Sequence, residues 1–304
     1  MMITNITKKM FLTSLTPIVA FSLFSPSLVN ACDPSGTSGI VEENNLYIAA
    51  DSKAIYTISN EKFDQILEKI NNIYSPIFTA KGKKLVIQKS WDDGTVNAYA
   101  QQEGNDWKIS MFGGLARHEA ITEDAFALVA CHEIGHHLGG APKKASQWGG
   151  AVSWASNEGQ ADYWGTMKCL RKYFEKDDNQ AVVAAMVVDQ YASNKCHQSF
   201  ANAEEIAICE RSSMAGLSLG NLFKALRNST VELKFDTPDG GRVTRTNDNH
   251  PASQCRLDTY FNSALCDKSH NDAVSNTDAN VGVCSERDNQ TVGIRPRCWF
   301  SPSK

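Results

Sequence analysis

The chain has 304 residues, of which 42% are hydrophobic, and its formal net charge at pH 7 is −4. That length and composition suffice for one compact hydrophobic core, so we expect a single domain with decorations. Because Lys and Arg are scattered through a slightly acidic chain, we expect neither nucleic acid nor an anionic membrane surface as a partner.

The first 31 residues are organised like a secretory signal peptide. Two lysines precede an apolar stretch from Met10 to Phe24, and Val29 and Ala31 occupy the positions before a cleavage site. This stretch is too short for a bilayer and contains Pro17, so a membrane span is the weaker alternative. No later segment is long and apolar enough to cross a bilayer, and we expect no transmembrane span in the mature chain.

Cysteine usage predicts an exported protein, either periplasmic or secreted. Removal of the signal peptide would leave Cys32 first, and VNAC partly matches a bacterial lipobox. Membrane attachment through a lipidated Cys32 therefore stands beside a plain cleaved signal. Eight further cysteines could form four disulfides, which persist in an oxidising compartment. Among many possible pairings, the sequence neighbours Cys255 with Cys266 and Cys284 with Cys298 are the first guesses.

Hydrophobic periodicity predicts the elements of the N-terminal half. Apolar residues spaced three and four apart predict a helix from about Leu46 to Ile77. The KLVIQKS stretch is typical of a strand, and the segment after it predicts two further strands with Asn105 and Asp106 in the turn between them. Thr122 and the acidic residues after it predict the start of a helix that stops at Gly139.

The C-terminal half is predicted to be mainly helical and then irregular. Helices are expected to begin near residues 154–157 and to cover about Asn179 to Tyr191 and Ala203 to Leu226. The rest is rich in loops, and residues 267–304 form an irregular Cys-containing tail that disulfides could tie down. We assign residues 32–266 to one domain with an α+β fold, mainly helical, with a small β-sheet.

The sequence VACHEIGHHLGGAP contains His132, Glu133 and His136 in the spacing HExxH. Two histidines four residues apart lie on one face of a helix and can bind one metal ion, while the glutamate can act as a general base. A surface helix that carries these residues by chance is the alternative. His137 points about 100° away from His136 around the helix, so we expect it to pack rather than to bind metal.

A catalytic zinc site usually needs a third protein ligand. The metzincin pattern HExxHxxGxxH would place a third histidine where this chain has Pro142, which offers no donor atom. Downstream, Glu158 and Asp162 are four residues apart on an expected second helix, so their carboxylates face the same way. Glu158 can supply the third ligand and Asp162 can orient a ligand histidine, which is the gluzincin arrangement.

The order of these motifs resembles the HtpX-like and CAAX-prenyl-endopeptidase-like family of gluzincin zinc metallopeptidases, which includes soluble periplasmic members of the BepA type. VNAYA at 96–100 is similar to the family's NAFA-type strand, and TEDAFALVACHEIGHH is similar to its HExxH helix. EGQAD at 158–162 matches its ExxAD motif, and HPASQCR, which begins at His250, matches HPxxxxR. The resemblance covers roughly residues 96–256.

This resemblance implies a zincin-type domain that binds one Zn²⁺ and hydrolyses peptide bonds. The implied roles are metal ligand for His132, His136 and Glu158, general base for Glu133, orienting carboxylate for Asp162, and oxyanion or lid contact for His250 and Arg256. The strand at Asn97, Ala98 and Tyr99 would present an edge to which an extended polypeptide substrate adds as another strand.

Some features depart from the family's pattern. The chain lacks the membrane spans of the family's embedded members, and the pattern does not explain Cys131, which could be a buried small residue, a disulfide partner or a redox-sensitive neighbour of the metal. His250 before Pro251 could simply form a turn. We predict an exported zinc-dependent endopeptidase that acts on envelope or misfolded proteins. The alternative is a latent form with His250 over the metal, or a non-proteolytic, zinc-containing, chaperone-like binding module.

Overall fold

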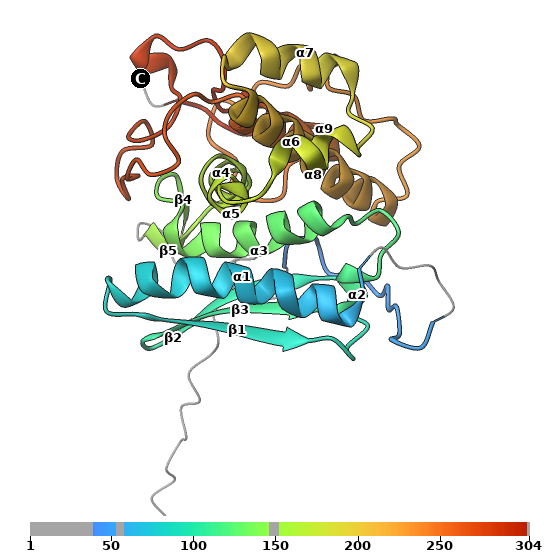
Figure 1. The fold of residues 1–304 in the computed structure, drawn as a ribbon. Coiled ribbons are helices and arrows are strands. Elements are labelled where there is room, and N and C mark those ends of the chain that lie inside the picture. Colours follow the sequence, from blue (N-terminus) through green and yellow to red (C-terminus); the bar gives the residue numbers. More distant parts are fainter. Residues whose placement is uncertain (1–38, 53–57, 146–151, 303–304) are drawn as a thin grey trace, which may run out of the picture.

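The computed structural model describes residues 39–52, 58–145 and 152–302. The predicted signal peptide (1–31) and Cys32 lie outside the described residues. Figure 1 shows the helices gathered over one face of a small β-sheet, with those of the C-terminal half farthest from it. The chain is α+β and mainly helical, as its sequence predicts.

The larger sheet has three strands, β1 (Lys84–Ser90), β2 (Ala98–Glu103) and β3 (Asp106–Phe112), in the order β1-β3-β2. Strand β1 lies parallel to β3, and β2 lies antiparallel to it. The three predicted strands and the turn at Asn105 are confirmed. Because β2 pairs with only one other named strand, it is an edge strand of this sheet.

Helix α1 (Asn60–Thr79) covers the sheet and starts later than predicted. The Ser59 hydroxyl accepts a backbone N–H of the first turn and so fixes the start of the helix. Leu46 is not helical, and its neighbour Tyr47 forms an antiparallel bridge with Thr95. The predicted start near Leu46 is therefore wrong, because the backbone here pairs with residue Thr95 and does not form the hydrogen bonds of a helix within the segment.

Helix α3 (Glu123–Leu138) crosses the interior between the sheet and the other helices. The Thr122 hydroxyl accepts the backbone N–H of Ala125 at 3.3 Å, and the helix ends at Gly139, both as predicted. Every residue from Ala125 to His137 is buried. A helix that is enclosed on all sides can hold polar side chains only where they find partners inside the protein.

The C-terminal half adds more helices and a two-stranded sheet. The remaining elements are α2 (Gly113–Ala116), β4 (Lys143–Ala145), β5 (Val152–Ser156), α4 (Glu158–Trp164), a π-helix (Gly165–Leu170), α5 (Arg171–Phe174), α6 (Asn179–Ala184), α7 (Gln190–Ser199), α8 (Ala203–Leu226), α9 (Ser253–Ala264) and a 3₁₀ turn (Glu286–Asp288). The predicted bounds of α8 are confirmed. The single helix expected over 179–191 is wrong, because the Asp189 carboxylate accepts two backbone N–H groups and starts a new helix at Gln190.

Helix α9 was not predicted from the sequence. Its N-cap residue is Ala252, which has no side-chain acceptor, and Pro251 precedes it. The usual start signals of a helix are therefore missing. Arg256 and Tyr260 project from α9 into the interior, where each is almost fully buried.

Four disulfides connect the eight cysteines of the described residues, which indicates an exported protein in an oxidising compartment. The bridges are Cys131–Cys169, Cys196–Cys209, Cys255–Cys298 and Cys266–Cys284. The guessed pairs Cys255–Cys266 and Cys284–Cys298 are wrong. Cys255 and Cys266 are separated by the length of α9, roughly 15 Å, which no disulfide can bridge.

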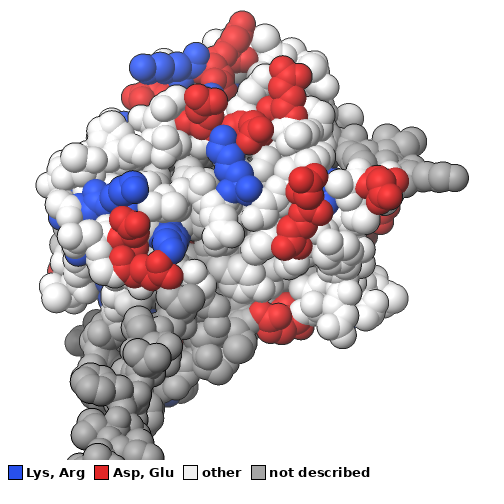
Figure 2. Space-filling view, turned by 90° about the horizontal axis from the view of Figure 1, so that it is seen from below, with Lys and Arg blue, Asp and Glu red and all other residues white. Residues whose placement is uncertain are grey.

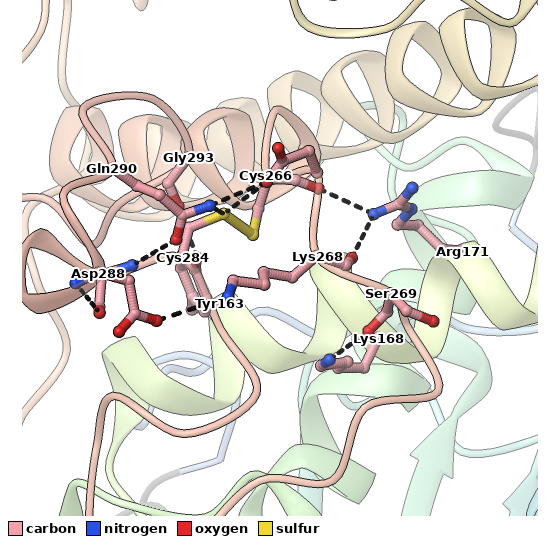
Figure 3. Close-up of a disulfide and its surroundings, with 12 residues drawn as sticks. Tyr163, Lys168, Arg171, Cys266, Lys268, Ser269, Cys284, Asp288, Gln290 and Gly293 are labelled. Carbon is pink, nitrogen blue, oxygen red and sulfur yellow. Dashed lines mark hydrogen bonds and ion pairs between the residues drawn. A yellow bond between two sulfur atoms is a disulfide. The ribbon is translucent and has the colours of Figure 1, made fainter.

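The tail after α9 is irregular but packs closely on the helices. Figure 3 shows Cys266–Cys284 beside α4 and the π-helix, where Arg171 donates hydrogen bonds to the carbonyls of Cys266 and Lys268. Farther along, the Trp299 indole is fully buried and donates a hydrogen bond to Thr259 on α9. The tail therefore forms small hydrophobic clusters with residues of the helices, beside the main core.

The surface carries charges of both signs. In Figure 2, which looks at the molecule from below, Lys and Arg side chains are interspersed with Asp and Glu. Lys89, for example, pairs with Asp64 at 3.2 Å. None of the helices in the described parts of the chain is long and apolar enough to cross a membrane.

The Cys131–Cys169 bridge closes a longer loop than Cys196–Cys209, with sequence separations of 38 and 13. Replacing both cysteines of the longer loop by Ala should lower the free energy of unfolding by about 4 kcal/mol, against about 3 kcal/mol for the shorter loop, because the longer crosslink restricts the unfolded chain more. Urea unfolding of the two double variants tests this order. Unchanged stability after loss of Cys131–Cys169 would contradict it.

Asp258 on α9 should make stability depend on pH. Its carboxylate accepts the backbone N–H of Asp239 and the amide of Gln254, each at 2.7 Å, yet burial raises its pKa from 3.8 to about 6. Because the folded-state pKa lies above the unfolded value, this contribution to stability is complete below pH 3.8 and is lost as the pH rises through 6.

Asp258→Asn should therefore reduce the fall in unfolding free energy between pH 4 and pH 7, as measured by urea unfolding at each pH. Asp236→Asn removes a carboxylate from an exposed position nearby and serves as the control. A fall that is the same in wild type and Asp258→Asn would rule out this role for Asp258.

Candidate metal centre

Two helices bring the HExxH motif and the downstream glutamate together. Helix α3 carries His132, Glu133 and His136, and Glu158 is the first residue of α4, directly after the N-cap Asn157. The Asn157 side chain accepts the backbone N–H of the third residue of α4, which fixes where the helix begins. All four site side chains are fully buried.

Small residues let these helices approach closely. A Cβ atom added to Gly135 on α3 would lie 2.9 Å from the Ala161 carbonyl oxygen on α4. A Cβ atom on Gly165, just after α4, would lie 3.2 Å from the backbone nitrogen of His132. A side chain at either position would push the helices apart and separate the side chains of the site.

The ligand atoms of His132, His136 and Glu158 face one another. Glu158 Oε2 lies 3.4 Å from His132 Nε2 and 3.8 Å from His136 Nε2. One ligand atom from each of the three residues lies within 4.8 Å of the other two. Ligand atoms around a tetrahedral zinc ion are about 3.3 Å apart, since each bond is about 2.0 Å long. The predicted triad is therefore spaced to hold a metal ion.

Two of these atoms have no hydrogen-bond partner within the described chain. His132 Nε2 and Glu158 Oε2 are both buried, and neither makes a hydrogen bond to a described residue. Burying a polar atom without a hydrogen-bond partner costs free energy, so such atoms are rare in natural proteins. A metal ion between the two side chains would satisfy both atoms, and the three residues fit such an ion by donor type as well as by spacing.

The ring orientation of each histidine is fixed from outside the triad. His132 Nδ1 lies 2.7 Å from Asp162 Oδ1, and His136 Nδ1 lies 2.8 Å from the Ser156 carbonyl oxygen. Both partners accept hydrogen bonds, so each Nδ1 carries a proton and each Nε2 atom is directed toward Glu158. Asp162 thus contacts the ligand histidine that the resemblance implied.

Asp162 also receives the side chains from α9. Arg256 donates two hydrogen bonds of 2.8 Å to its carboxylate, and the Tyr260 hydroxyl donates one of 2.6 Å. Burial would raise the pKa of Asp162, but the charges of Arg256 and His132 outweigh it and lower the pKa to about 2. In this structure Arg256 therefore supports the position of His132 through Asp162.

The same interactions change the proton affinity of His132. Burial favours the neutral ring, but Asp162 and Glu158 outweigh that effect and raise the pKa of His132 to about 9 in the metal-free chain. Burial lowers the pKa of His136 well below its ordinary value. Metal binding to the Nε2 atoms requires neutral rings, so it should displace a proton from His132.

Lys144 is a site residue that sequence reasoning missed. Its ammonium donates to Glu158 Oε1 at 3.0 Å, and the side chain is almost fully buried. This contact occupies one carboxylate oxygen and leaves Oε2 directed at the histidines. The sequence signal was weak, because a lysine in the short strand β4 looks like an ordinary surface residue.

His250 lies next to the triad. Its Nε2 atom is 3.3 Å from Glu158 Oε2 and 2.9 Å from the carbonyl oxygen of Gly39. The side chain is mostly buried, at 6% exposure. The structure therefore brings His250 to the metal centre from a loop far away in the sequence, just before α9.

The predicted substrate residues lie at the start of edge strand β2. Asn97 and Ala98 contact the segment that begins at Gly39, because the Ile40 N–H donates to the Ala98 carbonyl at 3.0 Å. The hydroxyl of Tyr99 donates to Glu43 at 3.2 Å. This end of β2 is thus bordered by the chain's own N-terminal segment.

His137 packs, as the helix geometry predicts. Its ring is stacked between Trp107 and Trp154, with ring centroids 5.2 and 4.9 Å away. Its Nε2 donates to the Lys108 carbonyl at 3.0 Å, and burial lowers its pKa to about 4. His137 is therefore a neutral ring that packs between α3 and strand β3.

No family model, curated protein or solved structure matches this chain. The buried group of His132, His136 and Glu158 can hold a metal ion.

Replacing Arg256 should lower the free energy of unfolding, because it leaves a buried carboxylate without a cationic partner. Arg256→Met would leave Asp162 without its cationic partner and lower the unfolding free energy by about 3–5 kcal/mol. Tyr260→Phe removes one hydrogen bond to the same carboxylate and should cost about 1–2 kcal/mol. Urea unfolding measures both changes. A smaller loss for Arg256→Met than for Tyr260→Phe would contradict the arrangement.

Proposed function

We propose that this protein is an exported zinc-dependent endopeptidase of the gluzincin type. The observation that carries the proposal is a pair of buried atoms, His132 Nε2 and Glu158 Oε2, that make no hydrogen bond within the described part of the chain and lie close to the buried Glu133. A site built only for stability would gain from apolar side chains at these positions. Burial of a triad of metal-binding side chains instead supports a functional metal centre.

The donor set favours zinc. Two imidazole nitrogens and one carboxylate oxygen are the protein ligands of many catalytic zinc sites, which keep one position open. Magnesium and calcium prefer ligand sets composed of oxygen. One Zn²⁺ per chain is therefore the metal that we propose for His132, His136 and Glu158.

When bound, zinc would lower the pKa of water and polarise a peptide carbonyl. Glu133 is adjacent to His132 on α3 and would take the proton from the attacking water and pass it to the leaving amine. His250 would donate a hydrogen bond from Nε2 to the carbonyl oxygen on which negative charge develops. Asp162 would hold the His132 ring in the required tautomer throughout.

The proposed substrate is an extended polypeptide. The side-chain amide of Asn97 accepts a hydrogen bond from the Val41 N–H and donates one to the Val41 carbonyl, as it could to any peptide in this position. Recognition through the backbone suits substrates of varied sequence. Unfolded or misfolded envelope proteins, the class implied by the resemblance, fit that requirement.

Glu133→Gln tests the proposed chemistry directly. The purified wild-type chain should contain one zinc and cleave casein, whereas Glu133→Gln should retain zinc and the same unfolding midpoint but lose at least about 100-fold in rate, because its amide cannot accept the water proton. Zinc analysis and a casein assay measure these properties.

The control is Glu119→Gln, which makes the same substitution at an exposed position. It should change neither zinc content nor rate. Full activity in Glu133→Gln would refute the assignment of the base. Zinc in all three proteins with no cleavage by any of them would favour the binding-module alternative.

A further inference from the structure

The first described residues run antiparallel to residues 94–98, which lead into edge strand β2, as a bound peptide would. Ile40 donates its N–H to the Ala98 carbonyl at 3.0 Å, and Val41 exchanges two hydrogen bonds of 3.4 and 3.3 Å with the Asn97 side chain. Farther along the same segment, Tyr47 and Thr95 form an antiparallel bridge. The segment therefore occupies the position at which a substrate strand is expected.

One peptide bond of this segment is connected to the candidate metal centre through His250. The Gly39 carbonyl accepts a hydrogen bond from His250 Nε2 at 2.9 Å, and the same nitrogen is 3.3 Å from the metal-directed oxygen of Glu158. On the other side of the bond, the Ile40 carbonyl accepts a hydrogen bond of 2.7 Å from Arg256. Donors thus hold the carbonyls on both sides of the amide nitrogen that joins Gly39 to Ile40.

The residues on both sides of this bond fit closely. A Cβ atom on Gly39 would lie 2.0 Å from the Ala98 carbonyl oxygen, so no larger residue fits there without a shift of the backbone. The Ile40 side chain is fully buried, and Val41 is 3% exposed. The site therefore matches a small residue before the bond and a branched apolar residue after it.

We propose that the metal-loaded chain hydrolyses its own Gly39–Ile40 peptide bond, in the same molecule. This inference rests on the proposed peptidase function and adds to it a first substrate, the N-terminal segment, with its point of cleavage. Three groups predicted from the sequence to serve catalysis or binding hold the three residues around this bond: His250 contacts the carbonyl of Gly39, Arg256 the carbonyl of Ile40, and Asn97 the backbone of Val41.

The step consumes one water molecule. Glu133 takes a proton from the water, and the oxygen of the water forms a bond to the Gly39 carbonyl carbon while His250 donates a hydrogen bond to the carbonyl oxygen. The bond from that carbon to the Ile40 nitrogen breaks as Glu133 passes its proton to the nitrogen. The second proton of the former water then leaves the new carboxyl group and is taken up by the amine, so the products are a carboxylate at Gly39 and an ammonium at Ile40.

Cleavage would also change access to the edge strand. The new ammonium of Ile40 would lie in a buried position, where a charge is costly unless partners compensate it. Withdrawal of the Ile40 end would then free Asn97 and Ala98 for other peptides. Before cleavage the same groups are engaged by the chain itself, so the uncut protein is a self-occupied form of the enzyme.

The test begins with the chain from Cys32 onward, purified with a chelator and then mixed with ZnSO₄. Intact mass and N-terminal sequencing should show loss of the residues through Gly39 and a new N-terminus at Ile40. The rate should be first order and unchanged by tenfold dilution. Glu133→Gln should keep its N-terminal segment, with at least about a 100-fold loss in rate, and should not be cut by added wild type.

Gly39→Ala gives a second, matched test. Its added methyl group meets the Ala98 carbonyl, so cleavage should slow by tenfold or more, whereas Gly240→Ala adds a methyl group that meets no atom within 4 Å and should leave the rate unchanged. Equal rates in these two variants would overturn the proposed position of the bond. If Gly39→Ala fails to fold, the comparison of wild type with Glu133→Gln still tests self-cleavage, because it does not use the glycine variants.

A parallel casein assay separates the two proposals. Wild type that cleaves casein but keeps residues before Ile40 overturns this inference and leaves the peptidase function standing. Zinc-loaded wild type that cuts neither casein nor itself overturns both. A new N-terminus at Ile40 in wild type and Glu133→Gln alike would identify another protease as the cause and overturn self-cleavage.

Discussion

The carboxylate of Asp162 joins three helices at one buried point. It lies on α4, orients His132 of α3 and receives the side chains of Arg256 and Tyr260 from α9. Without the arginine this carboxylate would be a buried, uncompensated charge, and without the carboxylate the imidazole would lose its orientation. The distance between the two motif helices, the tautomer of the ligand and the position of α9 are therefore set together.

The loop before α9 extends this arrangement to the edge strand. His250, six residues before Arg256, reaches both the metal-directed oxygen of Glu158 and the carbonyl of Gly39. Arg256 itself spans from Asp162 to the carbonyl of Ile40. The side chains around the candidate metal site thus also hold the chain's own segment at residues 39–40.

Local sequence patterns predicted the parts of the site that depend on local geometry. The sequence could predict four site residues because residues four apart on a helix share a face. They are His132, His136, Glu158 and Asp162. Helix α9 was missed because its start lacks a capping side chain. Lys144, the disulfide partners and the Gly39 segment depend on contacts between residues far apart in the chain, and no spacing in the sequence encodes those contacts.

X-ray absorption at the zinc edge of the loaded Glu133→Gln chain identifies the metal ligands themselves, since this variant should retain metal without turnover. We expect two imidazole nitrogens and one carboxylate oxygen at about 2.0–2.2 Å, with light-atom scatterers only. We also expect the imidazole signal to fall by half in a chain that additionally carries His132→Ala. Sulfur ligands at about 2.3 Å, or a spectrum unchanged by loss of His132, would contradict this assignment of the ligands.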